Sequence, residues 1–315
     1  YHCVATGYAG VLGSMAKHFY GSGLLISEHG IYTREREEEL IKASWVEGIY
    51  KDIWIEQFKK ISLLAYQRAD IVTSLYQHAR ELQMELGCSK EKLMVTPNGI
   101  QTQNLANLPG KSEEEKNIIS VGAVLRVTPI KDVKTMIQAF AFAKKKVPNL
   151  KLWIMGPTDE DKQYAQECFD LVQALRVEDV EFTGRIQVKD YLGRMDFTIL
   201  TSISEGQPLT ILESYAAHKP VIATDVGNCR ELIYGNQDGF GEAGILTHIM
   251  NLEEIAEAMI RLAMDEEERL RMGEAGYQRV MAFYRIEQMR DVYTDIYKKF
   301  AEQQNITWPE KKFEL

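Results

Sequence analysis

The sequence has few cysteines, and they are not grouped. Cys3, Cys88, Cys168 and Cys229 are scattered over 315 residues, so no pair has the spacing of a zinc knuckle or a redox motif. The six histidines show no zinc-ligand spacing either. We therefore expect reduced, mostly buried thiols and no bound metal.

The chain also lacks long apolar runs and an excess of positive charge. No apolar run approaches the roughly 18 residues of a membrane-spanning helix, and no signal peptide opens the chain. The formal net charge of −9 argues against a nucleic-acid partner. With 45% hydrophobic and 26% charged residues, the composition is that of a globular protein of about two domains. We expect a cytoplasmic protein.

Strand and helix patterns alternate in the first part of the chain, which predicts a parallel sheet with helices on its faces. The predicted strands are Tyr1–Thr6, Leu24–Glu28, Asp70–Ser74 and Leu93–Thr96, and the predicted helices are 9–20, 34–65 with breaks, and 77–86. The chain opens inside a strand without an initiator Met. Four strands are few for a nucleotide-binding half, so we expect an N-terminally truncated chain and an incomplete first domain.

A second β/α series follows a polar linker over residues 101–116. Its predicted strands are 117–123, 150–155, 180–183, 196–201 and 220–224, and its predicted helices are 132–146, 160–175, 189–195 and 208–217, with a helical tail over 252–300. The expected fold is α/β with two doubly wound, Rossmann-like parallel-sheet domains. The predicted divisions are a domain over 1–112, a nucleotide-sugar domain over 113–285, and a C-terminal helix and tail over 286–315.

Residues 202–213, Ser-Ile-Ser-Glu-Gly-Gln-Pro-Leu-Thr-Ile-Leu-Glu, form a predicted strand-to-helix corner. The run before it, Asp196–Thr201, is apolar and β-rich, as in a buried parallel strand. Pro208 suits the first position of the following helix, because the N–H that proline lacks has no helical partner there. The sequence thus predicts a corner at the carboxyl edge of the sheet, where ligands of such folds bind.

Two carboxylates lie on either side of this corner. The backbone N–H groups of Gly206, Gln207 and Leu209 would lie at the positive end of the helix and offer a phosphate site. Glu213 lies five residues after Pro208, about 7–8 Å along the axis at about 1.5 Å per residue. Glu213 would then reach a ribose diol, while Glu205 would face a sugar. Taken alone, two such acids are more often a solvated loop acid and an exposed helix residue, and the rest of the chain favours the binding role.

Two cations follow the first strand of the second series. Arg126 and Lys131 lie in a loop that opens a helix, with Asp132 as its predicted N-cap. At the carboxyl edge of a sheet, an arginine fork and a lysine point charge form a clamp for a diphosphate. Exposed loop cations are the alternative, and the nearby corner favours the clamp.

Three further loops follow predicted strands. Gly156–Asp161 could line the same edge or form a capped turn. Arg185, in Thr183-Gly-Arg, could help a backbone contact to a base. His29 ends the second strand of the first series and could face a bound sugar, although a lone histidine is more often structural.

The segments 121–131, 201–213 and 220–231 together resemble the retaining GT-B glycosyltransferases of family 4, whose hallmark is two glutamates separated by seven residues, as at 205 and 213. Residues 28–36, 129–135, 156–161 and 200–205 are similar to segments of the glycosyltransferases of Pel exopolysaccharide synthesis.

The resemblance implies GT-B architecture, a UDP-sugar donor, transfer with retention at the anomeric carbon, and no cofactor or divalent metal. The implied catalytic residues are Glu205, Arg126, Lys131 and His29, and the implied donor-binding residues are Gly206, Gln207, Pro208, Leu209, Thr210, Glu213 and Arg185. The implied partners are a glycan acceptor and membrane-bound polysaccharide export proteins at the inner face of the membrane.

The sequence departs from the family in lacking its N-terminal Gly-rich loop, so we expect incomplete activity from this chain. Two alternatives stay open. One is a UDP-sugar epimerase, for which no convincing acid–base cluster is found. The other is a catalytically inactive nucleotide-binding subunit of a polysaccharide secretion complex.

Overall fold

The computed structural model describes residues 1–105 and 107–308, which form two compact units. Unit 1 comprises Tyr1–Asn98 and Glu287–Leu315, and unit 2 comprises Gly99–Ile286. The first boundary thus differs from the predicted one after residue 112, because Ile100 pairs with Arg285 and Leu105 packs on the apolar core of unit 2. The predicted C-terminal piece is largely part of unit 1, and its residues 309–315 lie outside the described ones.

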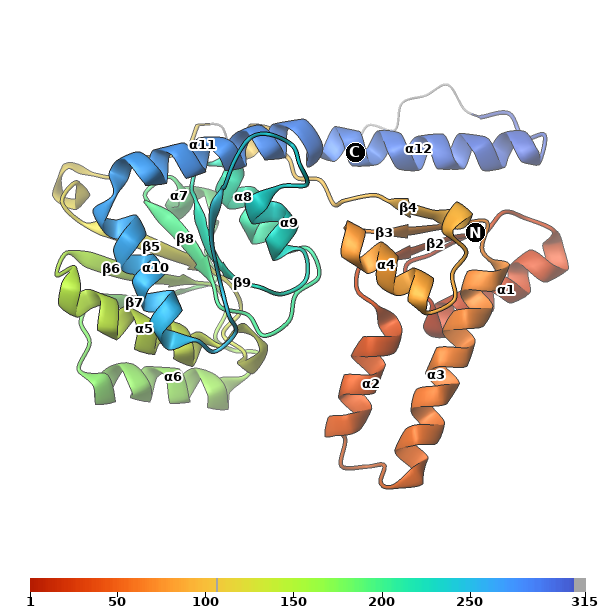
Figure 1. The fold of residues 1–315 in the computed structure, drawn as a ribbon, viewed down its shortest axis with the longest axis horizontal. Coiled ribbons are helices and arrows are strands. Elements are labelled where there is room, and N and C mark those ends of the chain that lie inside the picture. The colour runs from red at the N-terminus through yellow and green to blue at the C-terminus, as the bar shows by residue number, and fades with distance from the viewer. Residues whose placement is uncertain (106, 309–315) are drawn as a thin grey trace. The chain divides into compact units, whose positions relative to one another are not determined.

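Unit 1 is built on a parallel sheet of four strands in sequence order. The strands are β1 His2–Cys3, β2 Leu25–Glu28, β3 Ile71–Ser74 and β4 Leu93–Val95. The helices are α1 Gly7–Tyr20, α2 Tyr32–Lys42, α3 Ile49–Arg68, α4 Gln77–Glu85 and α12 Ile286–Gln303. The predicted strand Tyr1–Thr6 is too long, because β1 covers only His2–Cys3. The broken helical pattern over 34–65 is two helices, α2 and α3 (Figure 1).

The two faces of this sheet are covered differently. Ile26 and Val72 pack with Tyr66 of α3 in an apolar core. On the other face, the hydroxyl of Ser27 accepts a hydrogen bond of 3.1 Å from Tyr293 of α12. Because side chains alternate along β2, Ile26 and Ser27 lie on opposite faces of the sheet.

Unit 2 is the larger β/α unit. Its strands are β5 Ile119–Val124, β6 Leu150–Met155, β7 Val180–Gly184, β8 Phe197–Leu200, β9 Val221–Thr224 and β10 Gly244–Thr247. Its helices are α5 Val133–Lys146, α6 Lys162–Leu175, α7 Lys189–Leu192, α8 Leu209–Ala216, α9 Cys229–Tyr234, α10 Leu252–Met264 and α11 Glu266–Phe283. The predictions missed β10 and α9. Short 3-10 turns also occur: η1 Lys90–Lys92 in unit 1, and η2 Thr102–Leu105, η3 Glu113–Glu115 and η4 Pro129–Lys131 in unit 2.

The order of the parallel strands in unit 2 is β7-β6-β5-β8-β9-β10. The chain builds outward from β5 in one direction, then returns to β8 on the other side of β5 and builds the opposite way. This reversal defines a doubly wound sheet, and the crevice at its carboxyl edge lies between β5 and β8. The predicted corner after β8 and the predicted cationic loop after β5 therefore flank the same crevice.

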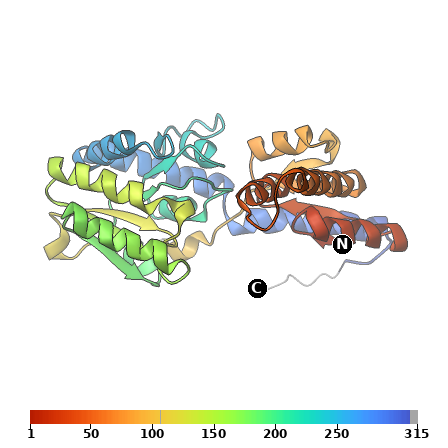
Figure 2. The ribbon, with the colours of Figure 1, turned by 90° about the horizontal axis from the view of Figure 1, so that it is seen from below.

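Helices cover both faces of this sheet (Figure 2). One core contains α5, α6 and α10 against β5, β6 and the inward residues of β8. The other contains α8, α9 and α11 against alternate residues of β8 and β9. The predicted apolar stripe of α5, including Val133, Met136, Ile137 and Phe140, is fully buried in the first core, as a helix of this spacing requires.

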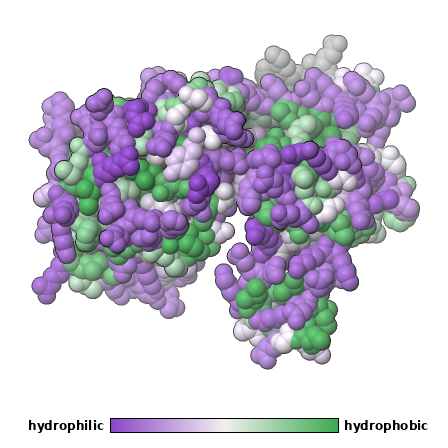
Figure 3. All heavy atoms as spheres, in the orientation of Figure 1, coloured by the Kyte–Doolittle hydropathy of each residue, from purple (hydrophilic) through white to green (hydrophobic). Residues whose placement is uncertain are grey.

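Several large apolar side chains on the α2–α3 pair are exposed, among them Trp45, Ile49, Tyr50 and Ile53. Figure 3 shows hydrophobic atoms at the free end of the α2–α3 pair. Within residues 1–105 and 107–308, no helix has both the length and the apolar character that a bilayer span requires.

Phe140→Ala should lower the free energy of unfolding by about 3–5 kcal/mol, because it leaves a cavity in the core of unit 2. Phe142→Ala, on the same helix but 46% exposed, is the matched control and should cost less than about 1 kcal/mol. Urea unfolding followed by circular dichroism measures both. Equal losses would contradict the assigned faces of α5.

Candidate functional site

A cavity of about 730 Å³ lies at the carboxyl edge of the sheet in unit 2. It is lined by Val124, Leu125, Arg126, Lys131, Met155, Gly156, Pro157, Arg185, Ile186, Val188, Glu205, Gln207, Pro208, Leu209 and Thr210. The structure thus brings the two predicted cations, Arg185 and most of the predicted corner together around one hollow. Its volume is in the range typical of small-molecule sites.

The loop between β5 and α5 carries the two cations. Asp132 caps α5 as predicted, since its carboxylate accepts a 3.4 Å hydrogen bond from the backbone N–H of Thr135. The loop is held to the neighbouring strand end by a 2.9 Å bond from the N–H of Val127 to the carbonyl of Pro157. At Gly156, an added Cβ would lie 1.9 Å from the carbonyl oxygen of Leu125. Only glycine permits this close approach, which holds the backbone at Leu125, directly before Arg126, against the end of β6.

Both arginines lie at the rim of the cavity and pair with acids of the β6–α6 loop. A nitrogen of Arg126 lies 2.9 Å from Glu160, and one of Arg185 lies 3.3 Å from Asp159. The two arginine side chains are 59% and 71% exposed. Exposed pairs of this kind contribute about 0–1 kcal/mol, so an anionic ligand can replace the acids at little cost.

Deeper in the cavity, Lys131 and Glu205 form an ion pair. Their side chains are 16% and 12% exposed, so solvent screens this pair less than the rim pairs. The same carboxylate oxygen of Glu205 also accepts a 2.5 Å hydrogen bond from the hydroxyl of Ser202. A cation and an acid, from strands on opposite sides of the switch point, thus face the cavity together.

The corner after β8 is braced from β9. The N–H of Asn228 donates to the carbonyl of Gly206 over 2.8 Å. Gly227 has a φ of 52°, and a Cβ there would lie 2.2 Å from the carbonyl oxygen of Glu205. The segment 220–231 carries part of the family resemblance, but no residue of the β9–α9 loop was among the predicted site residues. A glycine in the short loop between a strand ending at Thr224 and a helix beginning at Cys229 was the available signal.

Helix α8 begins at Leu209, one residue later than predicted. Pro208 is its N-cap, because a ψ of 110° places it outside the helical region. The carbonyl of Pro208 accepts from Ile211 over 3.2 Å. The N–H groups of the residues before Ile211 belong to the first turn, where helices leave donors open and favour anions.

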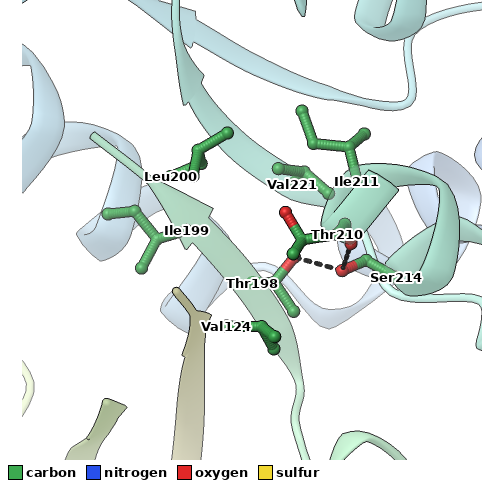
Figure 4. A pocket seen from close by; sticks show the side chains of 8 residues that line it. All are labelled: Val124, Thr198, Ile199, Leu200, Thr210, Ile211, Ser214 and Val221. Atoms are coloured by element: carbon green, nitrogen blue, oxygen red, sulfur yellow. Dashed lines mark hydrogen bonds between the residues drawn. The ribbon is translucent and has the colours of Figure 1, made fainter. Parts of the chain in front are cut away.

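A void of about 10 Å³ lies beneath the cavity and shares Val124 and Thr210 with it. Ser214 bridges this region in Figure 4: its hydroxyl accepts from Thr198 over 2.9 Å and donates to the carbonyl of Thr210 over 2.7 Å. The bond from Thr198 ties α8 to β8, and the bond to Thr210 lies within the first turns of α8. The space is about that of one water molecule.

Glu213 lies on α8 beyond the residues that line the cavity. Its side chain is partly buried, and burial raises the pKa of its carboxyl above the ordinary 4.5. Within the described part of the chain, no side-chain hydrogen bond or ion pair to this carboxylate is found. A desolvated acid without a protein partner is a characteristic of binding sites.

His29 belongs to unit 1, where it is exposed directly after β2. The preceding Glu28 is buried and accepts hydrogen bonds from Tyr66 at 2.5 Å, Gln83 at 2.9 Å and Thr6 at 3.1 Å. Burial raises the pKa of the Glu28 carboxyl, and these donors partly offset that rise. Glu28 was not among the predicted site residues, and its hydrogen bonds hold the end of β2 directly before His29.

Among residues 1–105 and 107–308, no three His, Cys, Asp or Glu side chains lie close enough together to hold a metal ion. The titratable groups of the cavity are instead arranged in pairs of opposite charge.

Comparison with known protein families gives two matches. Residues 102–279, more than half of the chain, match the family described as glycosyl transferases group 1. Residues 1–91 match a domain of unknown function, DUF3492.

Two curated relatives are similar to parts of the chain. N-acetyl-alpha-D-glucosaminyl L-malate synthase of Bacillus anthracis is 33% identical over 60% of this chain and 46% of its own length. An exopolysaccharide phosphotransferase of Streptomyces coelicolor is 30% identical over 74% of this chain and 24% of its own length. The chain therefore spans about half or less of these relatives.

A solved structure, Anabaena HepE in complex with UDP, superimposes with a TM-score of 0.76 at 19% identity, over 92% of this chain and 76% of HepE. At this identity the similarity concerns the fold. It confirms the predicted α/β fold with two parallel sheets and matches GT-B glycosyltransferase structures.

Gly227→Ala should destabilise the protein by about 2 kcal/mol or more beyond the effect of Gly239→Ala. Both glycines have positive φ, but a Cβ at Gly239 meets nothing within 4 Å, so only the left-handed backbone cost of about 1–2 kcal/mol applies there. At Gly227 the overlap with the backbone of Glu205 adds an overpacking cost. Chemical unfolding measures the difference, and equal losses would show that the brace is loose.

Glu213→Gln should raise the melting temperature at pH 7. A carboxyl whose folded pKa is raised binds more protons when folded, so stability falls as pH rises from 4.5 through the raised value. The glutamine variant escapes this loss, so its advantage should be present at pH 7 and absent below pH 4. Melting curves at both pH values check this, with Glu257→Gln, an exposed acid of α10, as control. A pH-independent difference would be inconsistent with the titration.

Proposed function

The chain belongs to the glycosyl transferases group 1 family, and from this premise we propose that it moves a sugar from a UDP-sugar donor to a growing exopolysaccharide with retention of anomeric configuration. The observation that carries the proposal is the cavity at the switch point of unit 2. Cations from the β5 loop, the acid of the β8 corner and a helix N-terminus all face it. Such an array suits a molecule with a diphosphate at its centre and a sugar at one end.

In this proposal Arg126 and Lys131 bind the diphosphate, and the backbone at Gly206, Gln207, Leu209 and Thr210 supplies N–H donors to it. The sugar–oxygen bond to the diphosphate breaks, and its electron pair leaves with the diphosphate. An acceptor hydroxyl forms the new bond at the same carbon, and its proton passes to the departing diphosphate. Fixed cations and helix N–H groups stabilise the charge that develops on the leaving group.

The remaining site residues take the roles that the family resemblance implies. Glu205 contacts the donor sugar, and Glu213 accepts hydrogen bonds from the ribose diol. Pro208 shapes the corner, and Arg185 lies on the base side. Burial without a protein partner supports a ligand contact for Glu213, and the weak rim pairs of the arginines support their release to an anion. His29 of unit 1 is proposed to act near the reacting sugar.

The choice of UDP is supported by the UDP-bound HepE of similar fold, and the choice of an exopolysaccharide by the Streptomyces relative. The segments at 28–36, 129–135, 156–161 and 200–205 also resemble those of PelF, the glycosyltransferase of Pel synthesis. On this reading the protein works beside membrane-bound export proteins and needs no divalent metal or cofactor.

Calorimetric titration without metal tests the donor site. UDP should bind more tightly than ADP or GDP, and Arg126→Ala should weaken UDP binding by about tenfold or more, as for loss of a charged hydrogen bond. Glu213→Ala should weaken it similarly. Arg271→Ala is the matched control, because Arg271 is an exposed arginine of unit 2 that pairs with Glu268 away from the cavity.

Absence of nucleotide binding by the folded protein would refute the donor site. Turnover that vanishes in Glu205→Ala, with UDP binding retained, would separate an enzyme from a catalytically inactive nucleotide-binding subunit. A product in which one ring carbon of the sugar has the inverted configuration, with no new glycosidic bond, would indicate an epimerase instead.

A further inference from the structure

One oxygen of Glu205 serves two donors. Oε1 accepts from the ammonium of Lys131 and, over 2.5 Å, from the hydroxyl of Ser202. Ser202 is fully buried. Within residues 1–105 and 107–308, the one side-chain hydrogen bond found for Ser202 is its donation to this carboxylate. The two donors differ in kind, since one is a long flexible cation and the other a short fixed hydroxyl.

Ser202 is anchored more firmly than Lys131. It lies two residues after the end of β8, and the buried hydroxyl of Thr224, at the end of β9, donates to the carbonyl of Ser202 over 2.6 Å. Lys131 is held through its backbone, whose carbonyl accepts from the hydroxyl of Thr201 over 2.9 Å. The ammonium of Lys131 lies beyond four rotatable side-chain bonds, so it can turn within the cavity while its backbone stays in place.

Binding of a diphosphate changes the partners of Lys131 but not those of Ser202. In the proposed function the ammonium turns toward the phosphate oxygens, where its charge is needed. The Glu205 carboxylate then loses its cation and would be free to rotate toward the arginines or the solvent. Among the described residues, the hydroxyl of Ser202 makes its one hydrogen bond to this carboxylate, so it remains there.

We propose that Ser202 is a positioning residue, whose hydroxyl keeps the Glu205 carboxylate aimed at the donor sugar once Lys131 has turned to the diphosphate. This inference rests on the proposed function and adds to it a residue outside the implied set. It makes Ser202 act through Glu205 alone, with no contact to the nucleotide.

The test compares UDP with a UDP-sugar in calorimetric titrations. The UDP-sugar is the one, among UDP-glucose, UDP-N-acetylglucosamine and UDP-N-acetylgalactosamine, that the wild-type protein binds most tightly relative to UDP. Ser202→Ala should bind UDP within about twofold of wild type, while its preference for the UDP-sugar should fall by about tenfold. Glu205→Ala should lose the same preference. Adding Ser202→Ala to Glu205→Ala should have no further effect, because residues acting through one group are not additive.

Thr247→Val is the matched control. It removes another buried hydroxyl of unit 2, one at the end of β10 that donates to the carbonyl of Ala223 over 3.4 Å and does not line the cavity, and it should leave the preference unchanged. Ser202→Cys keeps the packing and a weak donor, and should give a smaller loss in the same direction. Circular dichroism verifies that each variant is folded.

The results separate the two proposals. A wild-type protein that binds no uridine nucleotide refutes the proposed function, and the role of Ser202 falls with it. Normal UDP binding combined with a full preference in Ser202→Ala, or an equal loss on top of Glu205→Ala, overturns the role of Ser202 alone.

Discussion

The reversal of strand order between β5 and β8 is the constraint on which the rest of unit 2 depends. Because α5 and α8 leave these adjacent strands toward opposite faces of the sheet, the carboxyl edge between them stays open. The loop after β5 brings Lys131 to this edge, and the corner after β8 brings Glu205, 74 residues later in the chain. The two residues form an ion pair because the strand order places their loops side by side.

The site is close to self-neutralising. Arg126, Arg185 and Lys131 each pair with a carboxylate of the same unit, so the positive charges of the cavity are balanced before a ligand binds. The pairs differ in burial and therefore in how readily a ligand can replace one partner. The rim pairs are screened by solvent and easily exchanged, whereas the Lys131–Glu205 pair is enclosed and Glu205 also accepts from the hydroxyl of Ser202. Glu213 stands apart as a partly desolvated acid, whose cost to stability is acceptable where a ligand can supply the missing hydrogen bonds.

Loops that carry functional groups are held here by backbone contacts more than by side chains. Gly156 and Gly227 each allow a neighbouring carbonyl to approach more closely than any Cβ would permit, and the N–H of Asn228 fixes Gly206. The hydroxyls of Thr201, Ser202 and Thr224 complete the brace at the ends of β8 and β9. Sites supported in this way hold their geometry before the ligand arrives, which lowers the cost of binding.

The sequence by itself determined the β/α alternation, the apolar stripe of α5, the Asp132 cap and the two segments that meet at the cavity, because these depend on local periodicity and on residue types with strong positional preferences. It placed the helix start one residue early at Pro208, missed β10 and α9, and divided the units after residue 112, since boundaries depend on packing partners far along the chain. Only the tertiary structure decided that Lys131 and Ser202 donate to one carboxylate oxygen of Glu205. It also decided that the rim arginines pair with Asp159 and Glu160, and that the β9–α9 loop supports the corner. Contacts between residues many positions apart depend on strand order and burial. Both are properties of the whole fold, and the spacing of residues within one segment does not determine them.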